Sequence, residues 1–321
     1  EVFYKDHSLL CNFENGAEYY ELLVRSYTGS DLSVSEIKDK LTAKMQNDIG
    51  TVVSLSYKDE TLYDKMSVYP FDTTDPDTIL KYLLEAIKAD FPEGYDTNYT
   101  INNVPADIEK YESPAYFYVP HIDNTSRNNI YINKYEDYAD MDLYPTLAHE
   151  GFPGHMYQTT YFQNTNPELL RSLLGYTGYT EGWGLYSELY SYDLSGQDSN
   201  LAKFNKSMSC LSYDTYCLAD IGINYEGWSR QDTIDFVKSV GYDASVGDDV
   251  FETLIENPGL YLAYYIGYLE ITDMRTTAQD ELGDSFNIKN FHKFYLDIGP
   301  AQFEIINDRL NTWIATQKKL A

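Results

Sequence analysis

Two of the five histidines in this 321-residue chain lie close together around an acidic residue, in the segment LAHEGFPGH at residues 147–155. Two neutral imidazoles can hold a zinc ion while a neighbouring carboxylate takes a proton from the water that the metal activates. His149 and His155 are therefore candidate zinc ligands, and Glu150 is the candidate general base of a hydrolase. The alternative is a helix end at which the two histidines merely cap the backbone.

The spacing of the two histidines needs a break in the helix. Zinc-binding histidines on one helix are usually four residues apart, whereas His149 and His155 are six apart, which turns their side chains about 240° away from each other on a regular helix. Pro153 lacks an N–H group and its ring clashes with the carbonyl of His149, so a regular helix cannot continue through it. Gly151 and Gly154 allow unusual backbone dihedrals, and we expect a break that returns His155 to the face of His149.

A third ligand should come from another helix. Glu181 and Glu188, seven residues apart in the segment TEGWGLYSE, would lie on one helix face and suit a ligand with a supporting carboxylate. Glu226 repeats the Glu-Gly-Trp tripeptide and is a competing candidate.

The elements that must position these residues are mostly helical. Capping and periodicity predict helices over 17–27, from Ser33 to about Asn47, and from Asp75-Pro76 onward. Short aromatic and β-branched runs between 97 and 134 predict a small sheet. After Pro145 the chain is expected to be helical to Lys319. The breaks in this helical part are expected near 151–154, 164–167, 241–247 and 257–259. We therefore expect a mainly α protein with a small sheet (α+β), with its metal-binding helices at about 142–192. Residues 1–321 are expected to form one domain.

Composition excludes several classes of protein. Acidic residues outnumber basic ones by 51 to 23, and a net charge of −28 repels the phosphates of nucleic acids. No apolar run approaches the length of about 20 residues that spans a bilayer. Three cysteines cannot build a disulfide framework, and Cys210 and Cys217 are too far apart along a shared helix to bridge. The acidic, Tyr-rich composition and a first residue that is not Met favour an exported, extracellular or cell-surface protein, processed or part of a longer chain.

With these motifs the chain resembles the DUF885 family, whose members look like zinc metallopeptidases of the gluzincin type. The resemblance rests on His-Glu-x-x-Pro-Gly-His at 149–155, followed by Gln158, and on Glu-Gly-Trp-Gly-Leu-Tyr-x-Glu at 181–188. Weaker matches extend it over almost the whole chain, and they comprise Asn15-Gly16, Tyr27-Thr28-Gly29, Pro258-Gly259, Tyr264, Gly267, Arg275, Phe291-His292 and Gly299. Typical members are longer, so the chain resembles their C-terminal, metal-bearing part.

The resemblance implies a zinc-dependent peptidase, carboxypeptidase-like in one reading, that acts on a peptide substrate with Glu150 as general base. It also implies that His149 and His155 bind the zinc and that Glu181 is the third ligand, with Glu188 in support. Tyr264 would donate to the oxyanion, with Tyr265 as a rival and a core tyrosine as the structural alternative. Arg275 would pair with a substrate carboxylate or form a structural ion pair. His292 would lie near the site or cap a helix.

The chain departs from the family pattern in two places. Asn224 stands where many members have His, and Leu260 follows Pro258-Gly259 where the pattern has Gln. These differences concern substrate contacts. The alternative to a peptidase is an inactive, metal-bearing module that binds peptides or glycans. A calcium-dependent adhesive domain ranks last, because the chain has no Asp-x-Asp-x-Asp-Gly loop.

Overall fold

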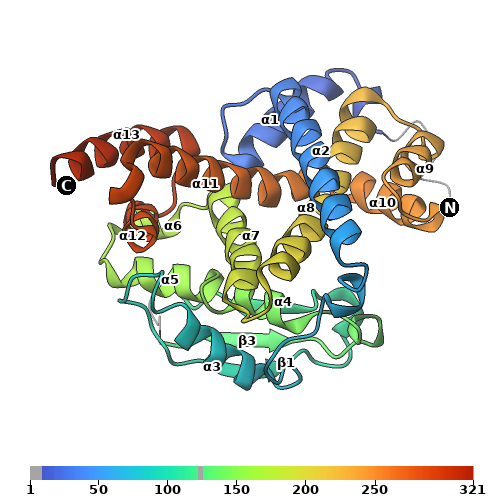
Figure 1. The fold of residues 1–321 in the computed structure, drawn as a ribbon. Helices are drawn as coiled ribbons and strands as arrows, with labels where there is room; N and C mark the ends of the chain where they lie inside the picture. Colours follow the sequence, from blue (N-terminus) through green and yellow to red (C-terminus); the bar gives the residue numbers. More distant parts are fainter. Residues whose placement is uncertain (1–8, 122–125, 321) are drawn as a thin grey trace.

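The computed structural model describes residues 9–121 and 126–320, and these form a mainly helical molecule with one small sheet, as the sequence predicts (Figure 1). The helices are α1 (Gly16–Thr28), α2 (Val34–Lys58), α3 (Pro76–Ala86), α4 (Leu143–Glu150), α5 (His155–Asn164), α6 (Leu169–Leu173), α7 (Thr177–Leu194), α8 (Ser199–Ile221), α9 (Arg230–Ser239), α10 (Ala244–Glu256), α11 (Leu260–Leu282), α12 (Ile288–Ile298) and α13 (Phe303–Leu320). The strands are β1 (Thr100–Asn103), β2 (Ala115–Tyr118) and β3 (Asn129–Ile132).

Helix α2 begins as predicted but runs further. The Ser33 side chain accepts from the Glu36 backbone N–H and the Glu36 carboxylate accepts from the Ser33 N–H, which is the reciprocal cap that the sequence indicates. The predicted end near Asn47 is wrong, because the helix continues to Lys58. Val52 and Leu55 extend its buried face, and the core beneath them therefore stabilises the additional turns.

The predicted breaks after Pro145 are present, and the structure adds others. Helix α8 leads directly into a short π-helix, Gly222–Glu226, which ends at Gly227 in the left-handed conformation. The sequence analysis did not predict the break at 174–176, between α6 and α7. Each of the other unpredicted breaks contains a glycine with positive φ, a conformation that other residues rarely adopt. These glycines are Gly196, Gly227, Gly283 and Gly299.

The sheet presents a free edge beside α4. Its strand order is β1-β3-β2, with β1 parallel and β2 antiparallel to β3, so the outer side of β2 pairs with no strand of the described residues. Ile130 and Ile132 of β3 and Phe117 of β2 are buried in the same apolar cluster as residues of α3 and α4. The sheet is therefore anchored on the helices, and β2 is held at a defined position.

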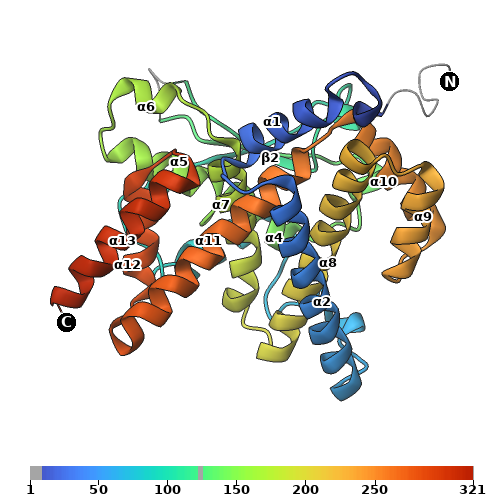
Figure 2. The same cartoon turned by 90° about the horizontal axis from the view of Figure 1, so that it is seen from above.

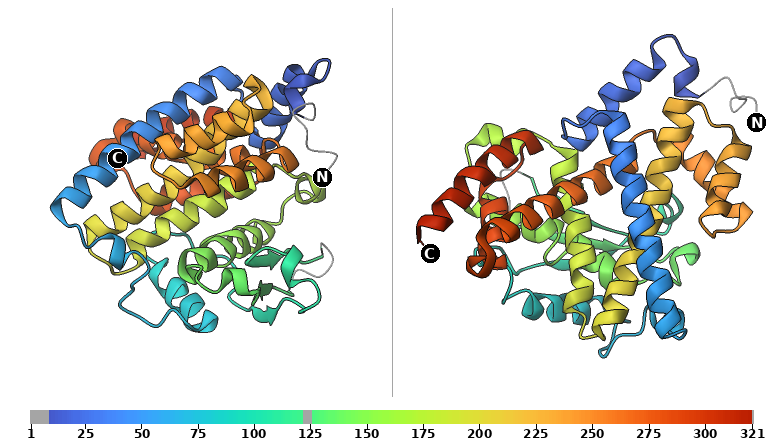
Figure 3. Two further views of the ribbon diagram at one scale, coloured as in Figure 1. Left: turned by 90° about the vertical axis from the view of Figure 1, so that its right-hand side faces the viewer. Right: turned by 45° about the horizontal axis from the view of Figure 1, so that its top comes forward.

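The helices and the sheet form two layers. Seen from the side, the sheet lies with α3, α4 and α5 beneath a layer of long helices (Figure 3). From above, α2 and α8 run side by side and α11 crosses the layer toward α12 and α13 (Figure 2). Helix α7 packs against α4 below it and against α8 and α11. It therefore connects the two layers.

The contact between α7 and α11 depends on two glycines. A Cβ atom on Gly182 would lie 2.5 Å from the Cα of Gly267, and a Cβ on Gly267 would lie 2.2 Å from the carbonyl oxygen of Gly178. The two helix backbones touch at this point, and any side chain would force them apart. This contact sets the position of α7, which carries the acidic residues of the candidate site.

Two exclusions drawn from the sequence agree with the described residues. Cys11, Cys210 and Cys217 are all free thiols, and the latter two are buried. Within 9–121 and 126–320, no helix is both long and apolar enough to cross a bilayer.

Candidate metal centre

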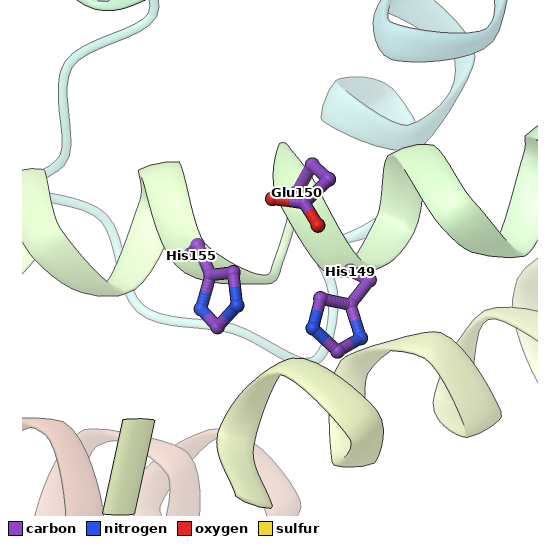
Figure 4. Close-up of side chains that lie close together, drawn as sticks. All are labelled: His149, Glu150 and His155. Carbon is purple, nitrogen blue, oxygen red and sulfur yellow. The ribbon is translucent and has the colours of Figure 1, made fainter. Parts of the chain in front are cut away.

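The break between α4 and α5 brings the two histidines together. His149 lies in the last turn of α4, which ends at Glu150, and His155 is the first residue of α5. Their ring centroids are 4.6 Å apart at an interplanar angle of 83°. Figure 4 shows both imidazoles pointing to the same side, toward α7, with Glu150 beside them. Ligand atoms of the three residues all lie within 4.8 Å of one another.

Residues 151–154 make this convergence possible through close backbone packing. A Cβ atom on Gly154 would lie 1.7 Å from the carbonyl oxygen of His149, so only glycine fits there. The indole N–H of Trp183 on α7 donates to the Pro153 carbonyl at 2.8 Å, and the N–H of Tyr157 donates to the Gly151 carbonyl at 3.1 Å. The turn is therefore fixed both to α7 and to the start of α5.

Glu181 completes a set of three donor groups. Its Oε2 lies 3.2 Å from Nε2 of His155 and 3.6 Å from Nε2 of His149. Two ligand atoms bound to one tetrahedral zinc at 2.0–2.1 Å lie about 3.3 Å apart. The two measured separations fall on either side of this value, and two imidazoles with a carboxylate are a donor set that zinc accepts. The side chains present therefore fit a zinc ion.

Glu188 orients one of the imidazoles. Its Oε2 accepts from Nδ1 of His149 at 3.1 Å, which places the N–H on Nδ1 and leaves Nε2 facing Glu181. Burial alone would lower the pKa of His149, but hydrogen bonding to Glu181 and Glu188 outweighs it and raises the pKa to about 10. Burial would raise the pKa of Glu181, yet the adjacent imidazoles hold it far below its usual range. The space between these groups therefore favours positive charge.

Glu150 is held by the sheet. Its Oε2 accepts the backbone N–H of Phe117 on β2 at 2.8 Å. This bond is made on the outer side of β2, since residue 117 is on the edge strand. One carboxylate oxygen is thus fixed, and the other has no protein hydrogen bond within the described ranges. The candidate base is therefore held in position by one oxygen, while its other oxygen remains available.

These residues line a cleft of about 420 Å³. Tyr264 of α11 lies in its wall, with its ring stacked 6.1 Å from that of His149. Burial, followed by the proximity of Glu181, raises the pKa of Tyr264, so its hydroxyl stays protonated and can donate. The rival, Tyr265, is instead buried in the core and stacked on Tyr213. The lining residues are Ser113, Pro114, Ala115, Tyr116, Phe117, Val119, Met141, Thr146, His149, Glu150, His155, Thr159, Thr180, Glu181, Glu188 and Tyr264.

Three sequence candidates are not brought into this cleft. Glu226 forms an exposed ion pair with Lys38. Arg275 donates to the Tyr186 hydroxyl at 3.2 Å, and the same hydroxyl is 2.9 Å from Nε2 of His292. The half-buried Arg275 and the buried His292 therefore belong to one hydrogen-bond network around the Tyr186 hydroxyl. Within the described residues Arg275 forms no ion pair with an acidic side chain.

The two departures from the family pattern also lie outside the cleft. Asn224 is buried and donates to the Asp220 carboxylate and to the Leu254 carbonyl, at 2.9 and 3.0 Å. Leu260 is the first residue of α11. The structure thus gives Asn224 a packing role and places neither residue against the candidate ligands.

Two contributors to the site were missed from the sequence. The N–H of Phe117 has no sequence signature, because every residue except proline carries a backbone N–H. Gly184 lies inside the recognised motif, and a Cβ there would be 2.5 Å from Nε2 of His149 and 2.8 Å from Cε1 of His155. The motif therefore contains the small residue over which both imidazoles pack, but only the structure shows the contact.

Comparison with known proteins agrees with the arrangement of elements. A family model described as "Bacterial protein of unknown function (DUF885)" matches residues 4–310. The chain belongs to the DUF885 family. No curated protein matches it.

Two solved structures are similar to this DUF885 chain in fold. One is described as the putative lipoprotein from Colwellia psychrerythraea, with a TM-score of 0.82 and 20% sequence identity over 96% of this chain. The other is a putative lipoprotein of unknown function from Shewanella oneidensis, with a TM-score of 0.72 and 19% identity over 91% of this chain. The matched regions are 57% and 59% of those two chains. The chain thus spans somewhat more than half the length of either structure.

Proposed function

We propose that this DUF885 chain carries a zinc-dependent centre that hydrolyses peptide bonds. The observation that carries the proposal is the convergence of His149, His155 and Glu181 at separations that fit one tetrahedral ion, beside a carboxylate that is not needed as a ligand. A purely structural zinc site is closed by four protein ligands, whereas a catalytic site keeps a position for water or substrate. Three donors opening into a cleft favour the catalytic type.

Zinc, when bound, supplies a Lewis acid that acidifies water and polarises a carbonyl group. His149 and His155 would hold it through Nε2, and Glu181 through its carboxylate. Glu150 would accept the proton of the attacking water on its free carboxylate oxygen and pass it to the leaving amine. The Phe117 N–H keeps that carboxylate in place throughout.

Tyr264 would support the same chemistry from another helix. Its raised pKa keeps the hydroxyl protonated at neutral pH, so it can donate to the oxygen that becomes negatively charged when water attacks the carbonyl. It is a donor carried by α11, whereas the base is carried by α4. The two groups therefore approach a substrate from different elements.

A peptide is the substrate class that the cleft wall favours. The outer edge of β2 presents main-chain groups to the cleft, and Ala115, Tyr116 and Phe117 line it. The Phe117 N–H is bound to Glu150, so a peptide would use the other outward groups of this edge. An extended peptide can add to such an edge through main-chain hydrogen bonds, which depend little on its sequence. We also propose an extracellular or cell-surface location, supported by the description of both structural neighbours as putative lipoproteins.

Metal content and one substitution test the proposal. Protein purified without added metal or chelator should contain about one zinc per chain by mass spectrometry, and it should cleave members of a peptide library. Glu150→Gln keeps the shape and the Phe117 contact but cannot take a proton, so it should retain the zinc and lose turnover by a factor of about 100 or more.

Two outcomes would contradict the proposal. Turnover that survives in Glu150→Gln would show that Glu150 is not the base. Wild-type protein that binds zinc but cleaves no member of the library would favour the inactive binding module.

A further inference from the structure

A second and larger cavity lies away from the metal cleft. It is a groove of about 830 Å³ lined by residues of α12, α13 and the segment from α6 to Tyr176. Figure 1 shows these helices together at the C-terminal side of the molecule. It shares no lining residue with the metal cleft. The proposed hydrolysis therefore does not account for it. Its lining residues are Arg171, Leu174, Tyr176, Asn290, Lys293, Phe294, Asp297, Ile298, Pro300, Ala301, Ile305, Arg309, Thr312, Trp313 and Gln317.

The groove is positively charged in a strongly negative protein. Three of its lining residues are basic and one is acidic, whereas the whole chain has 23 basic and 51 acidic residues. The single acid, Asp297, is already bound by the Tyr161 hydroxyl at 2.7 Å and by Lys293 at 2.5 Å. The other two bases are arginines. The groove thus has uncompensated positive charge that complements an anion.

The guanidinium of Arg171 is fixed in position by the protein. Its Nη2 donates to the carbonyls of Ile298 and Pro300, at 2.6 and 3.0 Å, and its guanidinium lies over the ring of Phe162. Both hydrogen bonds use Nη2, which leaves three N–H donors on the other nitrogens. Arg309 is exposed and has no hydrogen bond or ion pair within the described parts of the chain. One guanidinium is therefore pre-oriented and the other is free to close on a ligand.

The rest of the groove is apolar. Its aromatic lining residues are Tyr176, Phe294 and Trp313. Leu174 and Ile305 are 42% and 48% exposed there. The adjoining helix α6 adds leucines at 169, 170 and 173, which are 65%, 66% and 65% exposed. Apolar side chains exposed together beside a cavity mark a surface that binds a partner. The occupant must therefore combine a negative group with apolar groups.

We propose that this groove binds the C-terminal end of a peptide, with its carboxylate on Arg171 and Arg309 and its last apolar side chains on Phe294 and Trp313. The polar lining residues Asn290, Thr312 and Gln317 decide between a peptide and an acyl chain, because amide and hydroxyl groups can pair with a peptide backbone but not with a hydrocarbon. A second copy of this chain is disfavoured by a net charge of −28.

Binding without turnover tests this groove independently of the proposed hydrolysis. The probe is a rhodamine-labelled hexapeptide that ends in Leu-Leu-Phe with a free carboxylate, and fluorescence anisotropy is measured in excess chelator. The same peptide with a C-terminal amide should bind at least tenfold more weakly. Arg309→Gln should weaken the carboxylate peptide by about tenfold and leave the amide unchanged, because the arginine acts on the charge. Arg25→Gln, an exposed arginine of α1, is the matched control and should change neither affinity.

Arg171→Gln should have the same effect as Arg309→Gln. If it unfolds by circular dichroism, the exposed Arg309 decides the question alone. Equal affinity of acid and amide, or an Arg309→Gln variant that binds like the wild type, would overturn the proposal. Dodecanoate that binds more tightly than the peptide would assign the groove to fatty acids instead. A dimer in sedimentation that Arg309→Gln dissociates would assign it to a second copy.

Discussion

Helix α7 contacts two buried histidines on different faces, and their environments are opposite. Glu181 and Glu188 face His149, whereas Tyr186, about 140° around the helix from Glu181, faces His292. The carboxylates raise the pKa of His149 to about 10 against the effect of burial. Burial lowers the pKa of His292 to about 3. On one face of α7 the surroundings of His149 stabilise its positive charge. On the other face the surroundings of His292 keep it neutral.

The partners of His292 explain why it stays neutral. Its Nδ1 donates to the Asp90 carbonyl at 2.7 Å, and its Nε2 accepts from the Tyr186 hydroxyl at 2.9 Å. Phe91 stacks on the ring at 4.0 Å. Both nitrogens are satisfied by neutral groups, and no carboxylate of the described residues forms a hydrogen bond or an ion pair with the ring. The positive charge of Arg275 also lowers the pKa. The comparison teaches that a buried histidine becomes a candidate ligand through converging acids and an open cleft, and not through burial itself.

Gly182→Ala should disturb the environments of both histidines, because it displaces α7, the helix that contacts His149 and His292. The new Cβ would lie 2.5 Å from the backbone of Gly267, which cannot move like a flexible side chain. We expect a loss of more than about 3 kcal/mol in the free energy of unfolding, at the upper end for an overpacked core. Chemical denaturation measures it. Gly50→Ala is the control, since nothing lies within 4 Å of the added Cβ, and it should be neutral or stabilising.

Glu181→Ala should have the second largest effect, and it should affect only the face of α7 that meets His149. It removes one of three donor groups at the His149 face and leaves the His292 network untouched. We expect zinc affinity to fall by more than about 100-fold, beyond the 10–100-fold loss typical when a residue that supports a ligand is removed. Competition with a chelator measures the affinity. An unchanged value would move the third ligand to Glu188, since Glu226 is tied to Lys38 outside the cleft.

Glu188→Gln should have the next largest effect. The amide can still accept from Nδ1 of His149, but it lacks the negative charge that strengthens the imidazole as a ligand. Zinc affinity should fall by about 10–100-fold, while the free energy of unfolding of the metal-free protein changes little. A loss as large as that of Glu181→Ala would mean that Glu188 itself binds the metal.

His292→Gln should leave zinc affinity unchanged and alter the pH dependence of stability. The pKa of His292 is about 3 in the folded chain and rises to its ordinary value of about 6.5 on unfolding, so the unfolded state binds the extra proton between these limits. Stability from this group is therefore present above pH 6.5 and is lost as the pH falls toward 3, by about 1.4 kcal/mol per unit.

Thermal denaturation from pH 7 to 4 should show a smaller decline for His292→Gln than for the wild type. Equal declines would mean that the ring is not neutral in the folded state. A loss of zinc from His292→Gln at pH 7 would show that the His292 network affects the metal centre, although the structure separates the two.

The sequence predicted much of the fold and the centre of the site. Periodicity and caps located the helices and the small sheet, because these signals are local. The histidine pair and the candidate carboxylates were predicted from residue type, spacing and the resemblance to the family, with Pro153 as the reason for the break. Helix α2 was predicted too short at Asn47, since its last turns depend on packing against distant residues.

Other parts of the site could not be read from the chain alone. The Phe117 N–H meets Glu150 through a sheet edge 33 residues away, and a backbone donor leaves no pattern in the sequence. Arg275 and His292 looked suited to chemistry by type, yet both lie in a hydrogen-bond network with Tyr186. Their type was informative only once their neighbours were known.

The sequence by itself determined which groups can bind a metal and where the helix through them must break, because ligand type and proline geometry are properties of single residues. The tertiary structure decided which carboxylate meets the imidazoles, which histidine stays neutral, and which strand edge lines the cleft. These outcomes depend on how α7 packs against α4 and α11. The charge that a buried group carries is set by its neighbours in space, and the order of the chain does not specify them.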